Sequence, residues 1–231
     1  MEKIVFFTGA GVSEESGIPT FRDRMGLWNI TNPEEIASKS AWRDNRQEVL
    51  RFHNNMRRTV IESQPNEAHR LIASLQENYD VLVITQNVDD LHERAGSKNV
   101  IHVHGKILES RSTVNPNLVY PCLDDIHIGD KCDKGSQLRP NVIWFNEDLN
   151  EKEMEYCIEK VRECDCLVVV GTSLSVFPAN QLITYVSRES ELVIIDPNAQ
   201  SVEVNRRNTR FVPTIASEGM QIFLDHIRTL L

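Results

Sequence analysis

Short apolar runs alternate with segments of helical spacing along most of this chain of 231 residues, and this alternation restricts the folds that it can adopt. The apolar runs lie at residues 4–7, 80–85, 166–170 and 191–195. Helical spacing is found at residues 66–76, 151–163, 179–188 and 215–231. Apolar strands separated by helices are typical of a parallel sheet that is buried on both faces. The sequence therefore predicts an α/β fold, a doubly wound, Rossmann-like parallel sheet with ligands at the carboxyl ends of its strands.

Two segments do not follow the alternation. Residues 29–63 are polar and have helical spacing, whereas residues 106–141 are loop-like and carry several glycines and prolines. We expect a smaller inserted module built from a helical part, 29–63, and a loop-rich part, 106–137. The Rossmann-like domain then consists of residues 1–28, 64–105 and 138–231.

Composition excludes some classes of partner. The formal net charge of -9 argues against nonspecific binding to nucleic acid or to an anionic membrane surface, because both favour a basic patch. No apolar stretch approaches the roughly 20 residues that a membrane-spanning helix needs. The five cysteines are an odd number and no secretory signal precedes them, which favours a reducing, cytoplasmic setting.

A glycine-rich stretch, FTGAGVSEESGIPTFRD, directly follows the first apolar run. A strand followed by Gly9-Ala10-Gly11 and a short helix presents backbone N–H groups to a pyrophosphate, and glycine permits close approach. The position three residues after Gly11 is Glu14, so the spacing departs from the dehydrogenase fingerprint, and a simple tight turn is the alternative interpretation. Phe21 and Arg22 would lie in a loop over the phosphates.

Small and polar residues follow the other apolar runs as well. An amide pair and a carboxylate, Gln86, Asn87 and Asp89, suit recognition of a carboxamide and a ribose, although helix capping explains Asn87 or Asp89 equally well. Gly171-Thr172-Ser173 and Asn198 end two later runs and suit contacts with ribose or phosphate. Together these strand ends predict one crevice of nucleotide size.

Two histidines, in the stretch IHVHG, are candidates for a general base. The free pKa of histidine lies near neutrality, which suits this role. Alternation along a strand places His102 and His104 on the same face, so the pattern does not choose between them.

Five motifs in this order, GAGVSEESGIPTFRD, TQNVDDLHERAG, VHG, LRPNVIWFNEDL and GTSLSVFPA, resemble the sirtuin family of NAD-dependent protein deacylases. The small size resembles the prokaryotic members. The resemblance implies that His104 is the catalytic base and that Asn87 takes part in catalysis. It also implies an NAD site that includes Gly9, Ala10, Gly11, Ser13, Phe21, Arg22, Gln86, Asn87, Asp89, Gly171, Thr172, Ser173, Asn198 and Ala216.

The reaction that the resemblance implies is removal of an acyl group from a protein lysine. The acyl-lysine oxygen attacks the ribose carbon as nicotinamide leaves, His104 deprotonates a ribose hydroxyl, and O-acyl-ADP-ribose forms. The peptide would add as a strand in a groove that includes Val142, Ile143, Phe145 and Val176. NAD hydrolysis or ADP-ribosyl transfer at the same site is the alternative function.

Two features depart from the family pattern. Many sirtuins bind structural zinc with two Cys-x-x-Cys pairs, whereas residues 106–141 hold only Cys122 and Cys132, so we expect no metal. Acidic-acyl sirtuins carry a Tyr three residues before an Arg, and here Asn54 and Arg57 have that spacing without the Tyr. His53 lies one turn from Arg57 and is a candidate substitute. The Arg57-Arg58 pair favours succinyl or malonyl groups, but the sequence leaves acetyl open.

Overall fold

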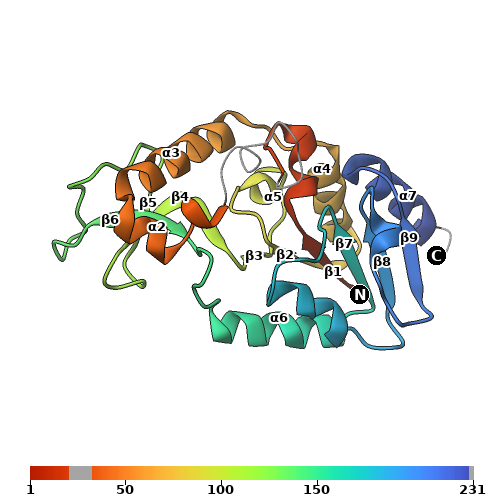
Figure 1. Ribbon diagram of the computed structural model, residues 1–231. Coiled ribbons are helices and arrows are strands. Elements are labelled where there is room, and N and C mark those ends of the chain that lie inside the picture. Colours follow the sequence, from red (N-terminus) through yellow and green to blue (C-terminus); the bar gives the residue numbers. More distant parts are fainter. Residues whose placement is uncertain (21–32, 229–231) are drawn as a thin grey trace.

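A parallel sheet of six strands forms the larger part of the molecule in the computed structural model, which describes residues 1–20 and 33–228 (Figure 1). Its strand order is β3 (Val100–His102), β2 (Asp80–Thr85), β1 (Lys3–Thr8), β7 (Cys166–Val170), β8 (Glu191–Ile195) and β9 (Thr209–Val212). All neighbours in this sheet pair in parallel. The predicted α/β fold with a doubly wound parallel sheet is therefore confirmed.

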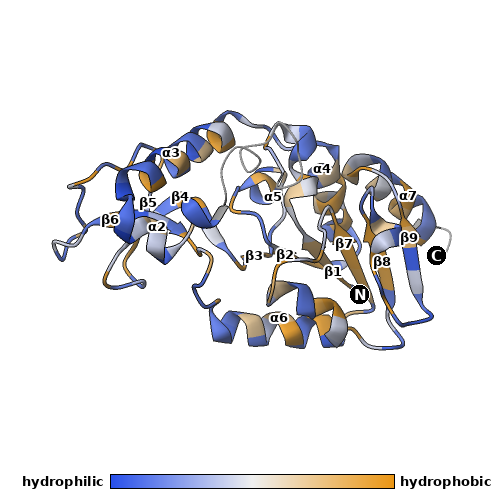
Figure 2. Cartoon of the chain, in the orientation of Figure 1, coloured by the Kyte–Doolittle hydropathy of each residue, from blue (hydrophilic) through white to orange (hydrophobic). Residues whose placement is uncertain are grey.

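Helices cover both faces of this sheet and explain why its central strands are apolar throughout. Helices α4 (Glu67–Ser74) and α7 (Ala216–Arg228) cover one face, where Phe6 meets Phe223 edge to face at 6.1 Å. Helix α6 (Glu151–Glu163) and the 3-10 helix η5 (Ala179–Tyr185) cover the other. The strands β7 and β8 are accordingly hydrophobic along nearly their whole length (Figure 2).

A second, smaller sheet lies beside the first. It is antiparallel, with strand order β5 (Val119–Pro121), β4 (Gly105–Ser112) and β6 (Leu138–Val142). Helices α2 (Lys39–Asp44) and α3 (Arg46–Glu62) lie beside this smaller sheet (Figure 1). A separate apolar cluster, which includes Val49, Val60, Ile107 and Trp144, joins α3 to this sheet. The expectation that residues 106–141 are loop-like was therefore wrong where these three strands form.

The remaining elements are short. They are the 3-10 helices η1 (Ala10–Val12), η2 (Glu14–Ser16), η3 (Pro33–Glu35), η4 (Leu75–Glu77) and η6 (Ala199–Ser201), and helix α5 (Leu91–Arg94). The helix predicted at 179–188 is the shorter 3-10 helix η5, and the one predicted at 66–76 is α4 continued by η4. None of the helices in the described ranges is long and apolar enough to cross a membrane. The exact domain boundaries stay a prediction.

Candidate NAD and acyl-lysine site

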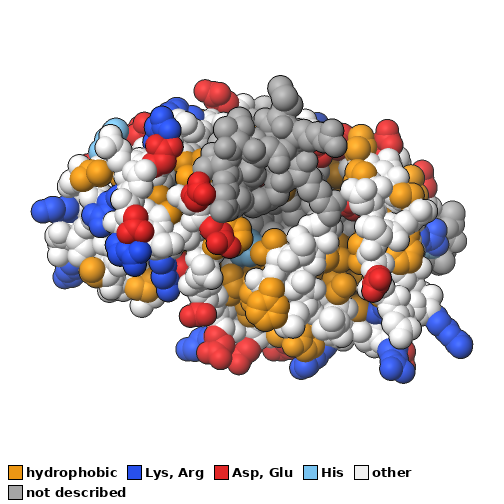
Figure 3. All heavy atoms as spheres, viewed as in Figure 1, with side chains coloured by type: hydrophobic (Ala, Val, Ile, Leu, Met, Phe, Trp, Pro, Cys, Tyr) orange, Lys and Arg blue, Asp and Glu red, His pale blue; other side chains and the backbone are white. Residues whose placement is uncertain are grey.

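A cavity of about 780 Å³ lies at the carboxyl ends of β1, β2, β7 and β8 and reaches the helix α3 of the small module. A doubly wound sheet places its ligand crevice at this edge, where the chain leaves neighbouring strands in opposite directions. Figure 3 shows hydrophobic side chains gathered in the middle of the visible face, above the charged side chains of α6. The described lining includes the carboxylates of Glu14, Asp89, Glu147 and Asp196 and contains no lysine or arginine.

Gly11, after β1, and Gly171, after β7, bring two backbone segments into contact. A Cβ on Gly11 would lie 2.8 Å from the Cα of Gly171, and a Cβ on Gly171 would lie 2.4 Å from the nitrogen of Val12. Gly171 also has a φ of 61°, which favours glycine. Because neither glycine has a side chain, the two loops pack against each other at one end of the cavity. Backbone that is free of side chains is also what close approach of a phosphate group requires.

A buried polar cluster ties this loop to the loop after β2. The Ser13 hydroxyl donates to Asp89 Oδ2 at 2.9 Å and accepts from the Asn87 Nδ2 amide at 3.0 Å. Burial raises the pKa of Asp89, against the hydrogen bonds that it accepts from the Leu91 N–H and from Ser13. The cluster fixes Asn87 and Asp89 on the cavity wall, so neither serves only as a helix cap.

The Gln86 side chain leaves a buried donor unused. Its Oε1 accepts from the Thr172 hydroxyl at 2.8 Å, whereas its Nε2 has no hydrogen-bond partner among the described residues. An unpaired buried amide donor costs free energy, so a ligand oxygen at this place would be bound favourably. The glycine cradle and this amide fit a polar ligand such as NAD, and Gln86, Ala10 and Gly11 would help to hold it.

The two candidate histidines have different surroundings. His104 lines the cavity and donates from Nδ1 to the Gln86 carbonyl at 2.9 Å, which leaves Nε2 as the nitrogen free to accept a proton. Burial lowers the pKa of His104, and the bond to Gln86 partly offsets this. His102 does not line the cavity and is bound to the Asn87 carbonyl and to Glu93. The geometry therefore favours His104 as a base.

Most residues predicted for the site are brought together by the fold. The predicted residues that line the cavity are Ala10, Gly11, Ser13, Gln86, Asn87, Asp89, His104, Val142, Ile143, Phe145, Gly171, Thr172, Ser173, Val176, Asn198 and Ala216. Gly9 lies behind this lining, where a Cβ would meet the Thr172 Cβ at 2.6 Å. Phe21 and Arg22 lie outside the described residues.

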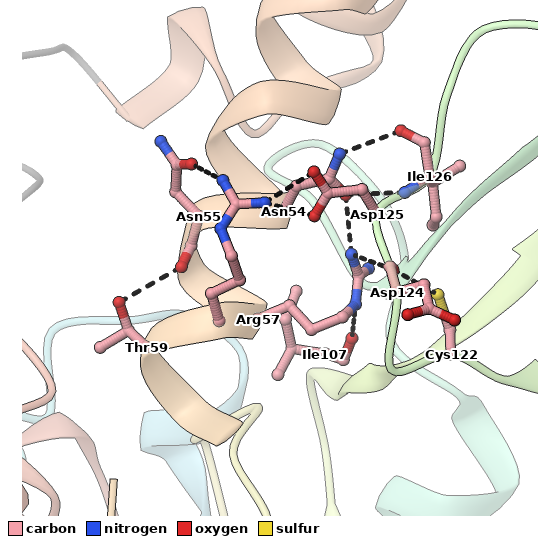
Figure 4. A network of polar contacts seen from close by, with 10 residues as sticks. Asn54, Asn55, Arg57, Thr59, Ile107, Cys122, Asp124, Asp125 and Ile126 are labelled. Carbon is pink, nitrogen blue, oxygen red and sulfur yellow. Dashed lines mark hydrogen bonds and ion pairs between the residues drawn. The ribbon is translucent and has the colours of Figure 1, made fainter. Parts of the chain in front are cut away.

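Arg57 and Asn54 are placed elsewhere than the sequence suggested. Neither lines the cavity; Arg57 is fully buried and donates from Nε to the Ile107 carbonyl at 3.0 Å and from Nη1 to the Asp124 carbonyl at 3.2 Å (Figure 4). The Arg57 Nη1 also donates to Asn54 Oδ1 at 2.7 Å, and Asn54 holds both main-chain groups of Ile126. The hydrogen bonds of both residues are thus made within the small module, and their predicted role in reading the acyl group stays a prediction that this placement does not support.

Helix α3 faces the cavity with His53, which the sequence offered as a substitute for the missing Tyr, and with two residues that the sequence interpretation missed. His53, Met56 and Val60 line it, together with Ala37 and Val88. His53 and Met56 are also three residues apart, so the spacing used for Asn54 and Arg57 fits them equally well. The apolar character of Met56 and Val60 on one helical face was the signal that would have identified the cavity side.

The predicted peptide groove has few free main-chain donors. The N–H groups of Ile143 and Phe145 donate to the carbonyls of His104 and Ala37, at 2.9 and 2.8 Å. The N–H of Trp144 donates to the Glu147 carboxylate at 2.9 Å. A peptide that pairs with this segment would therefore have to donate to its carbonyl groups.

No group of three or more His, Cys, Asp or Glu side chains within residues 1–20 and 33–228 is arranged to hold a metal ion. Cys122 and Cys132 are free, and their thiols interact with the hydroxyls of Ser110 and Ser112. The residues present do not fit a tetrahedral zinc site, and the metal content stays a prediction.

Comparisons with known proteins point to one family. A sequence model described as the Sir2 family matches residues 9–178. The NAD-dependent protein deacylase of Helicobacter pylori strain J99 is 42% identical over 221 residues, which cover 96% of this chain and 93% of that relative.

Solved structures agree with this similarity. A Sir2 homologue in complex with NAD superimposes with a TM-score of 0.87 at 38% identity, covering 99% of this chain and 90% of the homologue. A Sir2 variant with a deacetylated p53 peptide and 3'-O-acetyl ADP-ribose superimposes with a TM-score of 0.80 at 28% identity, covering 96% and 92% of the two chains.

Proposed function

Since the chain belongs to the Sir2 family and is an NAD-dependent protein deacylase, we propose that it removes neutral, apolar acyl groups from lysines rather than succinyl or malonyl groups. The observation that carries this proposal is the cavity wall of the small module, where Met56, Val60 and Ala37 are apolar. A succinyl carboxylate at this wall would find no lysine or arginine in the described lining to pair with. Burying an unpaired charge costs several kcal/mol.

His53 is the polar residue of this wall, and its hydrogen bonds keep it neutral. Its Nδ1 donates to the Val49 carbonyl at 2.7 Å, and its Nε2 accepts from Trp144 Nε1 at 3.1 Å. Burial lowers the pKa of His53 to about 4, despite the bond to Val49, and the charges of Arg139 and Arg57 act in the same direction as burial. His53 therefore offers no positive charge to an acidic acyl group at neutral pH.

We assign the chemical roles within the cavity on the same geometry. His104 acts as the base at Nε2, because its Nδ1 proton is held by Gln86. Ser13, Asn87 and Asp89 bind the ribose and nicotinamide side, and Gly11, Gly171 and Thr172 bind the phosphate side. NAD supplies the ADP-ribose acceptor when bound. An acyl-lysine peptide is the second substrate, as the peptide complex of the Sir2 relative suggests.

The test is turnover of matched acetyl-, butyryl- and succinyl-lysine peptides with NAD, followed by mass spectrometry. We expect the neutral acyl peptides to react at least about tenfold faster in kcat/KM, because an unpaired buried charge is rejected strongly. Met56→Arg would place a cation on the wall and raise the succinyl-to-acetyl ratio by roughly tenfold or more.

A matched control comes from the same helix. Arg58 forms an ion pair with Asp125 at the surface and does not line the cavity, so Arg58→Met is expected to leave the ratio unchanged. A wild-type enzyme that prefers succinyl, or a Met56→Arg ratio equal to wild type, would contradict the proposal. ADP-ribose release without acyl transfer on any peptide would instead support NAD hydrolysis.

A further inference from the structure

Three consecutive carbonyl groups of the cavity wall are held by one neighbouring segment. The Gln86 carbonyl accepts from His104 Nδ1 at 2.9 Å, and the Asn87 carbonyl accepts from His102 Nδ1 at 3.0 Å. The Val88 carbonyl accepts from the Ile107 N–H at 2.8 Å. The segment 102–107 thus fixes the backbone from which the Gln86 and Asn87 carboxamides project.

His102 differs from the other two donors in its second partner. Its Nε2 lies 2.8 Å from Glu93 Oε1, and the same oxygen accepts from Lys106 Nζ at 3.1 Å. A carbonyl oxygen and a carboxylate both accept hydrogen bonds, so both nitrogens of His102 carry a proton. His102 is only 7% exposed, so water competes little for its two hydrogen bonds.

Charged side chains from several elements surround His102. The carboxylates are Glu93 on α5, Asp89 in the loop after β2 and Glu153 on α6, and the ammonium group is that of Lys106 on β4. Burial works to raise the pKa of Glu93, but the hydrogen bond and charge of His102, with the bond from Lys106, lower it to about 2. His92, also on α5, is neutral, because burial lowers its pKa well below the ordinary value.

Asn87 is the residue on which this arrangement acts. Its N–H donates to Thr85 Oγ1 at 3.0 Å, its Nδ2 donates to Ser13, and its carbonyl accepts from the His102 ring. The first two contacts are between uncharged groups, so the bond from the His102 ring is the strongest of the three.

We propose that His102 and Glu93 form a charged positioning pair that orients Asn87 for the reaction, a role that rests on the proposed place of Asn87 in the NAD site. His102 does not touch the cavity and is therefore a positioning residue. In this arrangement Glu93 fixes the orientation of the His102 ring, and the ring fixes the Asn87 carbonyl, so loss of either contact displaces the Asn87 carboxamide.

Variants of Glu93 test the pair through kcat and the peptide KM with the acetyl-lysine peptide. Glu93→Ala removes the partner of His102 Nε2, so we expect kcat to fall by roughly fivefold with the peptide KM nearly unchanged, whereas Glu93→Gln keeps a side-chain oxygen that accepts from Nε2 and restores most of kcat. Lys106→Met is the control, because Lys106 contacts Glu93, and it is expected to leave kcat near the wild-type value. A merely structural role for Glu93 predicts a loss of stability without this split between kcat and KM.

His102→Asn supplies the third measurement. Asparagine keeps a neutral donor near the Asn87 carbonyl but cannot pair with Glu93, so kcat is expected to fall about tenfold with the peptide KM nearly unchanged. Thermal unfolding of each variant reports whether it folds. Wild-type kcat in folded Glu93→Ala and His102→Asn would overturn the proposal.

The outcome is separable from that of the proposed acyl preference. The kcat and KM values compare variants on one peptide, and the succinyl peptide replaces the acetyl peptide if wild type prefers it. A wrong acyl preference therefore leaves the test of the positioning pair intact, and a failed positioning pair leaves the acyl preference standing.

Discussion

At the scale of single residues, the contact between Gly11 and Gly171 leaves no room for a side chain. The atoms that a Cβ on Gly11 would meet are backbone atoms of Gly171, which cannot swing away as a flexible side chain would. We expect Gly11→Ala to separate the two loops and to raise the KM for NAD by roughly tenfold or more. The control is Gly17→Asn, because Gly17 has a φ of 85°, which asparagine tolerates, and open space around it. Equal KM values for both variants would contradict the cradle.

His104 gives a residue-scale prediction for pH. A base must be neutral to accept a proton, and burial lowers the pKa of His104 from its ordinary 6.5, with the Gln86 bond opposing the shift. Activity should therefore persist as the pH falls through 6.5 and be lost only as it falls through the lowered pKa. The measurement is the acid limb of kcat/KM, and a limb at or above 6.5 would be inconsistent with a buried His104 base.

The sequence identified some residues of the site and not others, and the difference has a physical reason. Glycines, amides and small hydroxyl residues at strand ends have chemistry that restricts their place, and the fold brings nearly all of them to the cavity. On α3 the spacing of three residues fits His53 and Met56 as well as Asn54 and Arg57, and only the packing of the helix on the small sheet selects the face. The choice between His102 and His104 likewise depends on long-range partners, Glu93 and the carbonyls of 86–87.

At the scale of elements, strands buried on both faces were predictable and strands of the small sheet were not. The strands β1, β2, β7 and β8 are continuous apolar runs, and a run of this kind indicates a strand without further context. Strand β5 has three residues, two of them exposed, and ends in Pro121. Strand β4 pairs with β6 across a bulge, and this pairing joins distant parts of the chain. Local sequence carries little information about such pairs.

Arg57 connects two elements of the small module, helix α3 and the loop that holds residues 124–126 (Figure 4). Arg57→Met would leave the Ile107 carbonyl without this donor, whereas the Asp124 carbonyl keeps the Cys122 thiol and the Asn54 amide oxygen keeps the Ile126 N–H. We expect the variant to lose about 1–3 kcal/mol of stability for the buried Ile107 carbonyl left unpaired. Hydrogen exchange should then rise in 122–126 and in α3 while β7 and β8 stay protected.

The contrast with Arg58 makes this element-scale prediction sharper. Arg58 pairs with Asp125 at the surface, where ion pairs contribute at most about 1 kcal/mol. Arg58→Met should therefore unfold at nearly the wild-type temperature. Equal stability of Arg57→Met and Arg58→Met would show that the buried guanidinium does not hold the module.

At the scale of the whole molecule, three buried neutral histidines make the fold sensitive to acid. His53 and His69 have pKa values lowered to about 4, by burial first, and burial also lowers the pKa of His92 well below 6.5. They lie in different places: His53 is on α3, whereas His69 and His92 meet at 4.8 Å between α4 and α5. Proton uptake by these histidines on unfolding therefore destabilises both the small module, which holds His53, and the larger domain, which holds His69 and His92.

The sign of the effect follows from proton linkage. Between pH 6.5 and 4 the unfolded state binds more protons at these histidines than the folded state, so stability falls as the pH falls. Each histidine with a pKa near 4 accounts for about 3 kcal/mol once the pH has passed through this window. Asp89 and Glu153, whose pKa values are raised by burial, act in the opposite direction and reduce the total.

We therefore expect the free energy of unfolding in urea to fall by several kcal/mol between pH 7 and pH 4.5, before carboxylates with lowered pKa values such as Glu93 begin to protonate. His69→Gln isolates one contribution, because His69 occupies the third position of the α4 capping box, where glutamine also caps well. This variant should lose less stability on acidification than wild type while remaining folded at pH 7. An unfolding free energy that is level across this range in wild type, or equal slopes in the two proteins, would mean that the buried histidines do not govern the acid response.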